Sequence, residues 1–156
     1  MTWRPDLTVA AVVQRDGRFL IVEERIRELR VFNQPAGHVE DGESLLAAVV
    51  RETFEETAWH FVPQQLLGMY LWRNEANGRS TVRVAICGEV TAREADRRLD
   101  RGILAAHWLT REDLLARETR LRSPLVLRCV DDYLAGRRYA LEALQHVGSA
   151  DFARSA

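Results

Sequence analysis

The chain has 156 residues, a hydrophobic fraction of 47% and a charged fraction of 29%, which are ordinary values for a soluble globular protein. We expect a single domain over residues 1–147 and a flexible tail over residues 148–156, which are small and polar. The net charge of −1 gives no overall field that would favour nucleic acid or a membrane surface as a partner. Neither a signal peptide nor an apolar run of membrane-spanning length is present, so a cytoplasmic location is expected.

The first third of the chain predicts strands. Residues 7–14 and 19–23 are apolar and β-branched, and the Asp16-Gly17 pair between them is typical of a hairpin turn. Residues 31–34 predict a short strand that ends at Pro35, because proline cannot donate to a ladder of hydrogen bonds.

Residues 45–57 predict a helix that begins after Ser44, a residue type that caps helix N-termini. Leu46, Val50 and Phe54 recur every fourth residue and predict the side of this helix that faces the core. The glutamates of the helix would then lie on the opposite, charged side.

The remaining elements alternate between strands and helices. Residues 66–72, 81–90 and 103–109 predict strands, and residues 110–116 predict a helix capped by its first residue. A last helix is expected from Pro124 to about residue 135. This order predicts an α/β fold in which a mixed β-sheet is sandwiched between α-helices.

The most informative segment lies on the first predicted helix. Glu52, Glu55 and Glu56 occupy positions i, i+3 and i+4, which fall within one quadrant of a helix. Three like charges so close together repel each other, and a hard divalent cation is the usual reason for gathering them. Mg²⁺ takes oxygen ligands from a few carboxylates and completes its shell with water and substrate phosphate.

The spacing of this segment resembles the signature box of the Nudix hydrolases. In that box a glycine, a glutamate and an Arg-Glu-x-x-Glu-Glu segment occur at fixed intervals, and here they are Gly37, Glu43 and residues 51–56. Thr53 replaces an aliphatic residue of the pattern. Ala58 replaces a glycine that ends the helix in a left-handed conformation, at a cost of about 1 kcal/mol if that geometry is kept. The resemblance implies the same mixed sheet between helices.

The resemblance also implies roles for the box residues, with Mg²⁺ as cofactor and Mn²⁺ as a possible substitute. Glu55 and Glu56 would be metal ligands together with the carbonyl oxygen of Gly37, and Glu52 would be either a ligand or the general base. Glu43 and Arg51 would be a structural pair that orients the helix carboxylates. From the residues alone, an arginine among four glutamates offsets their repulsion, and a solvated i,i+4 pair with Glu55 is the alternative for Arg51. The expected catalytic set is Glu43, Arg51, Glu52, Glu55 and Glu56.

Three candidate substrate contacts are basic or hydroxyl side chains outside the box. Arg83 alternates with apolar residues on a strand, so it faces either a substrate groove or solvent. Arg122 and Ser123 precede a helix whose free N–H groups favour phosphate, although a helix cap alone would also explain Ser123.

Three further candidates lie on predicted strands. Glu23, like its neighbour Glu24, could contact a base or a second metal, or simply face water. Phe32 and Trp72 could stack on a heterocycle, or could belong to the core.

Four other segments resemble the NudJ-type bacterial phosphatases, namely residues 22–24, 33–38, 121–126 and the Gly136-x-x-Tyr139 pair. That resemblance implies release of inorganic phosphate from nucleoside tri- and diphosphates, and action on hydroxymethylpyrimidine diphosphate. A pyrophosphatase of ADP-ribose, dinucleotides or nucleotide sugars is the alternative enzyme. A non-catalytic nucleotide-binding module is the third hypothesis, and the retained box glutamates count against it. The expected partner is a small nucleotide or nucleotide-like diphosphate, and the protein would be a monomer or a homodimer.

Overall fold

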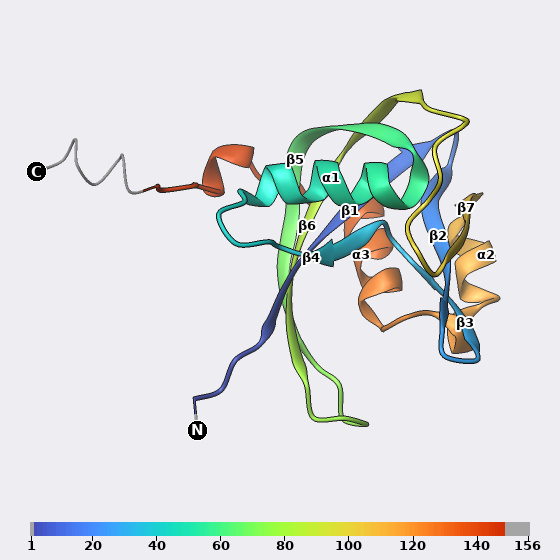
Figure 1. The fold of residues 1–156 in the computed structure, drawn as a ribbon, viewed down its shortest axis with the longest axis horizontal. Coiled ribbons are helices and arrows are strands. Elements are labelled where there is room, and N and C mark those ends of the chain that lie inside the picture. Colours follow the sequence, from blue (N-terminus) through green and yellow to red (C-terminus); the bar gives the residue numbers. More distant parts are fainter. Residues whose placement is uncertain (1, 149–156) are drawn as a thin grey trace, which may run out of the picture.

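The computed structural model describes residues 2–148, and within them a seven-stranded mixed sheet carries helices on both faces (Figure 1). The strands are β1 (Asp6–Arg15), β2 (Arg18–Ile26), β3 (Leu29–Asn33), β4 (Ala36–His38), β5 (Trp59–Arg73), β6 (Ser80–Arg93) and β7 (Ile103–Leu109). The helices are α1 (Leu45–Thr57), α2 (Arg111–Leu115) and α3 (Leu125–Leu134), with short 3-10 helices η1 (Glu118–Arg120) and η2 (Leu141–Ala143). The predicted α/β class, a mixed sheet between helices, is confirmed.

The sheet is mixed because its central pair is parallel. The strand order is β3-β2-β1-β6-β5, with β4 paired to β1 and β7 paired to β2. Strands β1 and β6 run parallel over eight residue pairs, from Asp6 opposite Thr81 to Val13 opposite Gly88, whereas the other pairs are antiparallel. The short strand β4 therefore places residues 36–38 beside the first half of β1, directly before the loop that leads into α1.

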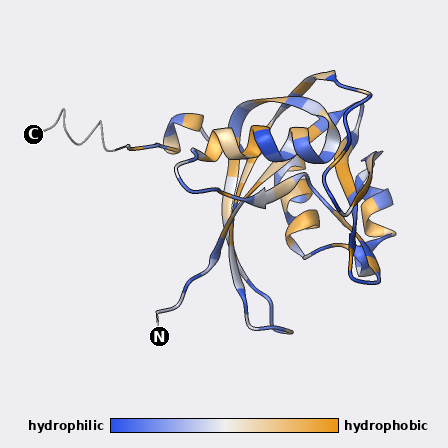
Figure 2. Ribbon diagram, in the orientation of Figure 1, coloured by the Kyte–Doolittle hydropathy of each residue, from blue (hydrophilic) through white to orange (hydrophobic). Residues whose placement is uncertain are grey.

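Two apolar cores lie on the two faces of the sheet, and the hydropathy colouring shows apolar residues on the strands between the helices (Figure 2). Helix α1 covers one face, where Ala48 and Val49 pack with Val84 and Ile86 of β6. Helices α2 and α3 cover the other face through Leu114, Val126, Cys129 and Val130. Both cysteines are buried and free, as expected of small core residues.

Several elements have the bounds or turns that short sequence patterns predict. Asp16 and Gly17 both have positive φ angles, 51° and 74°, as a two-residue hairpin turn requires. Helix α1 spans the predicted residues, and the side chain of Ser44 accepts a hydrogen bond from the backbone N–H of Ala47. Strand β7 also has the predicted bounds. Helix α3 begins at Leu125, one residue later than predicted, with Ser123 accepting from the backbone N–H of Leu125.

The predicted core side of α1 was wrong only in part, since Leu46 and Val50 do pack against the core on this face of the sheet. Leu46, Val50 and Phe54 are only partly buried, whereas Glu52 and Glu56 are 9% and 8% exposed. The helix is rotated so that its glutamates face inward toward the β4 segment, because burial of the small residues Ala48, Val49 and Thr53 brings that side against the sheet. The Thr53 hydroxyl is satisfied by donating to the carbonyl of Val49 at 2.7 Å.

Strand β5 is longer than predicted, since it begins at Trp59 rather than near residue 66. Pro63 lies in its first half, and proline disfavours a strand prediction. Proline is nevertheless tolerated at the edge of a sheet, where β5 lies, and the register between β5 and β6 shifts on both sides of Pro63. Gly88 permits this close pairing, because a Cβ at that position would lie 2.1 Å from the carbonyl oxygen of Val62.

Two other sequence expectations concern the ends and the exterior of the chain. Apart from Gly148, the tail expected over residues 148–156 lies outside the described residues. No helix in the described part of the chain is long and apolar enough to cross a membrane.

Candidate active site

The box glycine and the first helix glutamate are in direct contact. A Cβ at Gly37 would lie 2.2 Å from the carboxyl carbon of Glu52, which is too close for any side chain. Gly37 belongs to β4, which pairs with β1, so the sheet fixes its position while α1 brings Glu52 against it. The pattern of the box thus has a steric reason: the carboxylate occupies the space that a side chain at position 37 would fill.

The side chain of Arg51 hydrogen-bonds three of the four box glutamates. Its guanidinium donates to Glu43 through Nε at 2.7 Å, and through Nη1 to Glu52 at 2.9 Å and to Glu55 at 3.1 Å. Its Nη2 donates to the carbonyl of His38 at 3.1 Å. The hydrogen bond from Arg51 holds the pKa of Glu43 below its usual range. The expected Glu43–Arg51 pair is therefore present, and it ties the loop before α1 to the helix carboxylates.

Glu56 is the most strongly perturbed carboxyl group of the site. Burial raises its pKa to about 9, and the nearby carboxylates of Glu52, Glu24 and Asp100 add to the effect. One hydrogen bond, from the backbone N–H of Ala36 to Oε2 at 3.0 Å, opposes this shift. Burial also raises the pKa of Glu52. Arg51 is the positive group bonded to the other three box glutamates, whereas Glu56 has no cationic partner among residues 2–148, and a bound divalent cation would supply positive charge there.

The donor chemistry of the cluster fits a hard divalent cation, since every side-chain donor is a carboxylate oxygen. In residues 2–148 no three acidic, histidine or cysteine side chains converge on one point as they stand. In the middle of α1 the guanidinium of Arg51 hydrogen-bonds both Glu52 and Glu55. A cation bound there would compete with this guanidinium for the two carboxylates.

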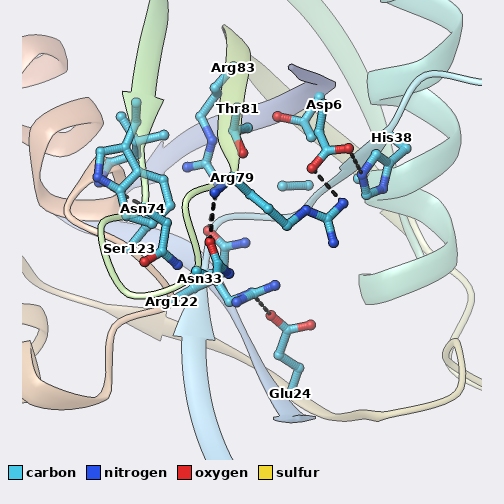
Figure 3. Close-up of a pocket in the computed structure, with 16 residues that line it drawn as sticks. Asp6, Glu24, Asn33, His38, Asn74, Arg79, Thr81, Arg83, Arg122 and Ser123 are labelled. Carbon is cyan, nitrogen blue, oxygen red and sulfur yellow. Dashed lines mark hydrogen bonds and ion pairs between the residues drawn. The ribbon is translucent and has the colours of Figure 1, made fainter. Parts of the chain in front are cut away.

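A cavity of about 320 Å³ opens beside this cluster (Figure 3). Ala36 and Gly37 of β4, together with Glu24, form the part of its wall nearest the carboxylates. The rest of its lining is largely polar and comes from strands β1, β3, β4, β5 and β6, from the loop between β5 and β6, and from the segment that leads into α3. The lining residues are Asp6, Thr8, Glu24, Asn33, Ala36, Gly37, His38, Trp72, Asn74, Asn77, Arg79, Thr81, Arg83, Arg122, Ser123 and Leu125.

Four of the six predicted substrate contacts line this cavity. Arg83, Arg122, Ser123 and Trp72 reach it from three separate parts of the chain. Arg83 is 5% exposed and faces the α3 side of the sheet, so it is neither an edge nor a solvent-facing arginine. Arg122 forms an ion pair with Glu24 at 3.5 Å.

The other two predicted contacts lie elsewhere. Phe32 is 4% exposed and belongs to the core on the α3 side, with the guanidinium of Arg120 over its ring at 4.9 Å. Glu23 pairs with Phe32 across the strands and hydrogen-bonds His107 at 3.0 Å. Because side chains alternate along a strand, Glu24 rather than Glu23 points into the cavity.

Sequence reasoning assigned no role to three side chains that help to build the site. Asn33 and Gln34 accept hydrogen bonds from Arg83, and Asp100 adds negative charge near Glu52 and Glu56. Residues 33–38 resemble a segment of the NudJ-type phosphatases, but the sequence gives no separate signal for the roles of Asn33 and Gln34. Asp100 belongs to no motif in the sequence. It lies near the box because its own backbone N–H donates to the carbonyl of Glu55, a contact between residues far apart in the sequence.

Comparison with known proteins defines the class of this chain. The model of the NUDIX domain matches residues 4–129, which is most of the chain, so the protein belongs to the Nudix hydrolase family. It is accordingly an enzyme that hydrolyses phosphoanhydride bonds.

Individual relatives narrow the resemblance. The chain is 36% identical over 142 residues to the phosphatase NudJ of Shigella boydii and of Escherichia coli K12, covering 91% of this chain and 92% of each relative. A Nudix hydrolase structure from Nitrosomonas europaea is 43% identical with a TM-score of 0.90, covering 92% of this chain and 98% of that one. A MutT Nudix hydrolase from Burkholderia pseudomallei shares the fold at 23% identity and a TM-score of 0.69, covering 83% of this chain and 98% of its own.

Proposed function

We propose that this chain is a Mg²⁺-dependent phosphohydrolase that releases inorganic phosphate from nucleoside tri- and diphosphates and from hydroxymethylpyrimidine diphosphate. One observation carries the proposal. The buried Glu56 accepts a hydrogen bond from the backbone N–H of Ala36, and Ala36 also lines the cavity. Ala36 therefore joins the acidic cluster to a cavity that is lined by arginine and amide side chains. The similarity to phosphatases named NudJ supports release of phosphate.

The acidic side of the site would hold the cofactor. Glu52, Glu55 and Glu56, with the carbonyl oxygen of Gly37, would bind Mg²⁺, and Mn²⁺ would be able to replace it. When bound, the ion neutralises phosphate oxygens and lowers the pKa of a bound water. Glu43 and Arg51 position the helix carboxylates through the hydrogen bonds described above.

The cavity side would hold the substrate. Arg83 and Arg122 offer N–H donors to phosphate oxygens, and the ring of Trp72 offers a face for a heterocycle. Water attacks the terminal phosphorus and loses its proton to a carboxylate of the site. The bond between that phosphorus and the bridging oxygen breaks, and the bridging oxygen leaves with the remaining nucleotide.

Phosphate release by the purified protein with Mg²⁺ tests this proposal. The substrates would be a panel of nucleoside tri- and diphosphates, ADP-ribose and hydroxymethylpyrimidine diphosphate, each with and without added inorganic pyrophosphatase. Glu56→Gln serves as the inactive variant. Glu94→Gln is the matched control, because Glu94 is exposed and pairs with His60 away from the cavity.

We expect phosphate without the added pyrophosphatase, and its loss in Glu56→Gln but not in Glu94→Gln. A signal that needs the added enzyme would instead define a pyrophosphohydrolase of triphosphates. Nucleoside monophosphate formed from ADP-ribose would favour the alternative pyrophosphatase. Absence of any product with every substrate would contradict the proposal.

A further inference from the structure

Arg83 is a buried cation with unused donors. Its Nη1 donates to Oε1 of Gln34 at 2.9 Å, and its Nη2 donates to Oδ1 of Asn33 at 3.1 Å (Figure 3 draws the second bond). Among residues 2–148 it forms no ion pair, and its buried Nε has no hydrogen-bond partner. Of the five N–H donors of the guanidinium, two bond these amide oxygens, a side-chain hydrogen bond links the group to the Cys129 thiol, and the one at Nε has no partner.

In the part of the chain that the structure describes, the charge of Arg83 also has no carboxylate paired with it. Glu56 and Glu24 act on the guanidinium only at longer range, since neither of them forms an ion pair with it. Glu24 is engaged with Arg122. The Cys129 thiol lies beside the guanidinium, and burial raises its pKa, so the thiol is uncharged. A buried, unpaired cation at a cavity wall favours an anionic ligand.

Arg83 fixes the orientation of both amide groups. Because a guanidinium only donates, the side-chain oxygens of Asn33 and Gln34 must face it and their nitrogens must face away. The nitrogen of Gln34 donates to the carbonyl of Val126 on α3 at 2.9 Å, which locks that side chain in place. The nitrogen of Asn33 donates to no protein acceptor in the described part of the chain, and Asn33 lines the cavity.

We propose that Arg83 and Asn33 form a donor-only site that binds a phosphate group of the substrate other than the one that is attacked. Both side chains present only N–H groups to this part of the cavity, and phosphate oxygens only accept. Gln34 is a positioning residue, since it touches Arg83 and α3 but not the cavity. The inference rests on the proposed function for the source of the phosphate group.

Replacement of Asn33 by aspartate tests the site with the least change in shape. The aspartate keeps an oxygen toward Arg83, so the buried guanidinium gains an ion pair, while the donor to the cavity becomes an acceptor. Asn77→Asp is the matched control, because Asn77 lines the same cavity and its side-chain oxygen already accepts from the backbone N–H of Arg79. Both variants add one negative charge to the same cavity.

Binding of inorganic phosphate to the metal-free protein is the first readout, measured by calorimetry in the presence of EDTA. We expect Asn33→Asp to weaken phosphate binding by about 10- to 100-fold, the loss typical of a charge-assisted hydrogen bond. Phosphate should raise the melting temperature of the native protein and of Asn77→Asp, but not that of Asn33→Asp. Equal weakening in the two variants, or unchanged binding in Asn33→Asp, would overturn the proposal.

Arg83→Gln gives an independent comparison, with Arg73→Gln as its control because Arg73 is exposed and pairs with Glu75 outside the cavity. Arg83→Gln should also weaken phosphate binding, while Arg73→Gln should not. With a hydrolysed substrate, Asn33→Asp should raise KM more than it lowers kcat. Hydrolysis with an unchanged KM in Asn33→Asp would refute the donor site and leave the proposed function intact. Phosphate binding that depends on Asn33 in a protein without hydrolysis would refute the function instead.

Discussion

The carboxylate of Glu52 occupies the space beside Gly37 that a side chain at position 37 would need. The two residues are 15 positions apart, and a Cβ on Gly37 would lie 2.2 Å from the carboxyl carbon of Glu52. A strand of three residues and the middle of α1 therefore meet where the Glu52 carboxylate fills the space beside Gly37. The geometry of the acidic cluster depends on this contact.

Gly37→Ala should abolish most of the activity without unfolding the protein. The added methyl group must displace the Glu52 carboxylate, which is the end of a flexible side chain, so the fold can adjust while the acidic cluster cannot. We expect kcat/KM to fall by about 100-fold, as a misplacement near 1 Å does in other active sites. Steady-state kinetics and thermal unfolding of the same preparation measure the two effects.

Gly17→Ala is the control for Gly37→Ala, because it should lower stability and leave activity unchanged. Gly17 has a φ of 74° in the β1–β2 turn and no neighbour that a methyl group would meet. The variant should lose about 1 kcal/mol of stability and keep its activity. If Gly37→Ala retained native kcat/KM, the proposed role of Glu52 would be wrong.

Glu56 should make the metal-free protein less stable as the pH rises. Its pKa is about 9 in the folded protein and near 4.5 when unfolded, so between these values the folded state binds the extra proton. Stability then falls with increasing pH by up to about 1.4 kcal/mol per unit. Glu56→Gln removes this dependence and should be more stable than the native protein at pH 8, although inactive.

Chemical denaturation in EDTA at pH 5, 7 and 8.5 measures this effect. Addition of Mg²⁺ should stabilise the native protein more than Glu56→Gln, because a bound cation favours the ionised carboxylate. Parallel stability curves for the two proteins across this pH range would show that Glu56 is not the group responsible.

Glu43 should contribute stability with the opposite dependence on pH. The hydrogen bond from Arg51 lowers the pKa of Glu43 in the folded protein, so its contribution is complete above the unfolded value near 4.5 and is lost as the pH falls through the lower folded value. Glu43→Gln should therefore destabilise the protein at pH 7 and make it less sensitive to acid below pH 4.5. Denaturation at pH 3.5, 5 and 7 compares the variant with the native protein, and Glu40→Gln, which lies 3.8 Å from Arg51 and is largely exposed, is the control.

Ala58→Gly should stabilise the protein. Ala58 ends α1 in the left-handed conformation, with a φ of 62° and its N–H bonded to the carbonyl of Phe54. Glycine adopts this conformation without the steric cost of a Cβ, so we expect a gain of about 1 kcal/mol. The corresponding change Ala116→Gly at the end of α2, where φ is −63°, should bring no gain. Equal thermal shifts in the two variants would contradict this account of the helix end.

Local chemistry made much of the fold predictable. Ser44 and the length of the apolar pattern set the start and end of α1, and Asp16-Gly17 set the first turn, because these signals act within a few residues. The charge cluster was likewise evident from the i, i+3 and i+4 spacing of the box glutamates. The geometry of Ala58 followed from its place in the box pattern.

The buried side of α1 was predicted only in part and the start of β5 incorrectly, because both depend on contacts between residues far apart in the sequence. Leu46, Val50 and Phe54 have the period of a buried face, but the small residues Ala48 and Val49 allow the other side of α1 to approach the sheet. The start of β5 was missed because Pro63 argues against a strand. Proline is accepted here because β5 is an edge strand, and that position is known only from the assembled sheet.

The cavity was the least predictable part of the molecule. Glu23 and Glu24 are chemically alike, and only the pairing of β2 with β3 and β7 decides which of them points to the cavity. Asn33 has no motif of its own, and its orientation follows from Arg83, which is 50 residues away in the sequence.

Hydrolysis of a nucleoside triphosphate in ¹⁸O-labelled water tests the central claim most directly. With Mg²⁺ present, we predict that the label enters inorganic phosphate, that the nucleoside diphosphate is unlabelled, and that Glu56→Gln forms neither product. Label in pyrophosphate or in nucleoside monophosphate would contradict attack at the terminal phosphorus. Full activity in Glu56→Gln would contradict the assignment of the acidic cluster as the catalytic site.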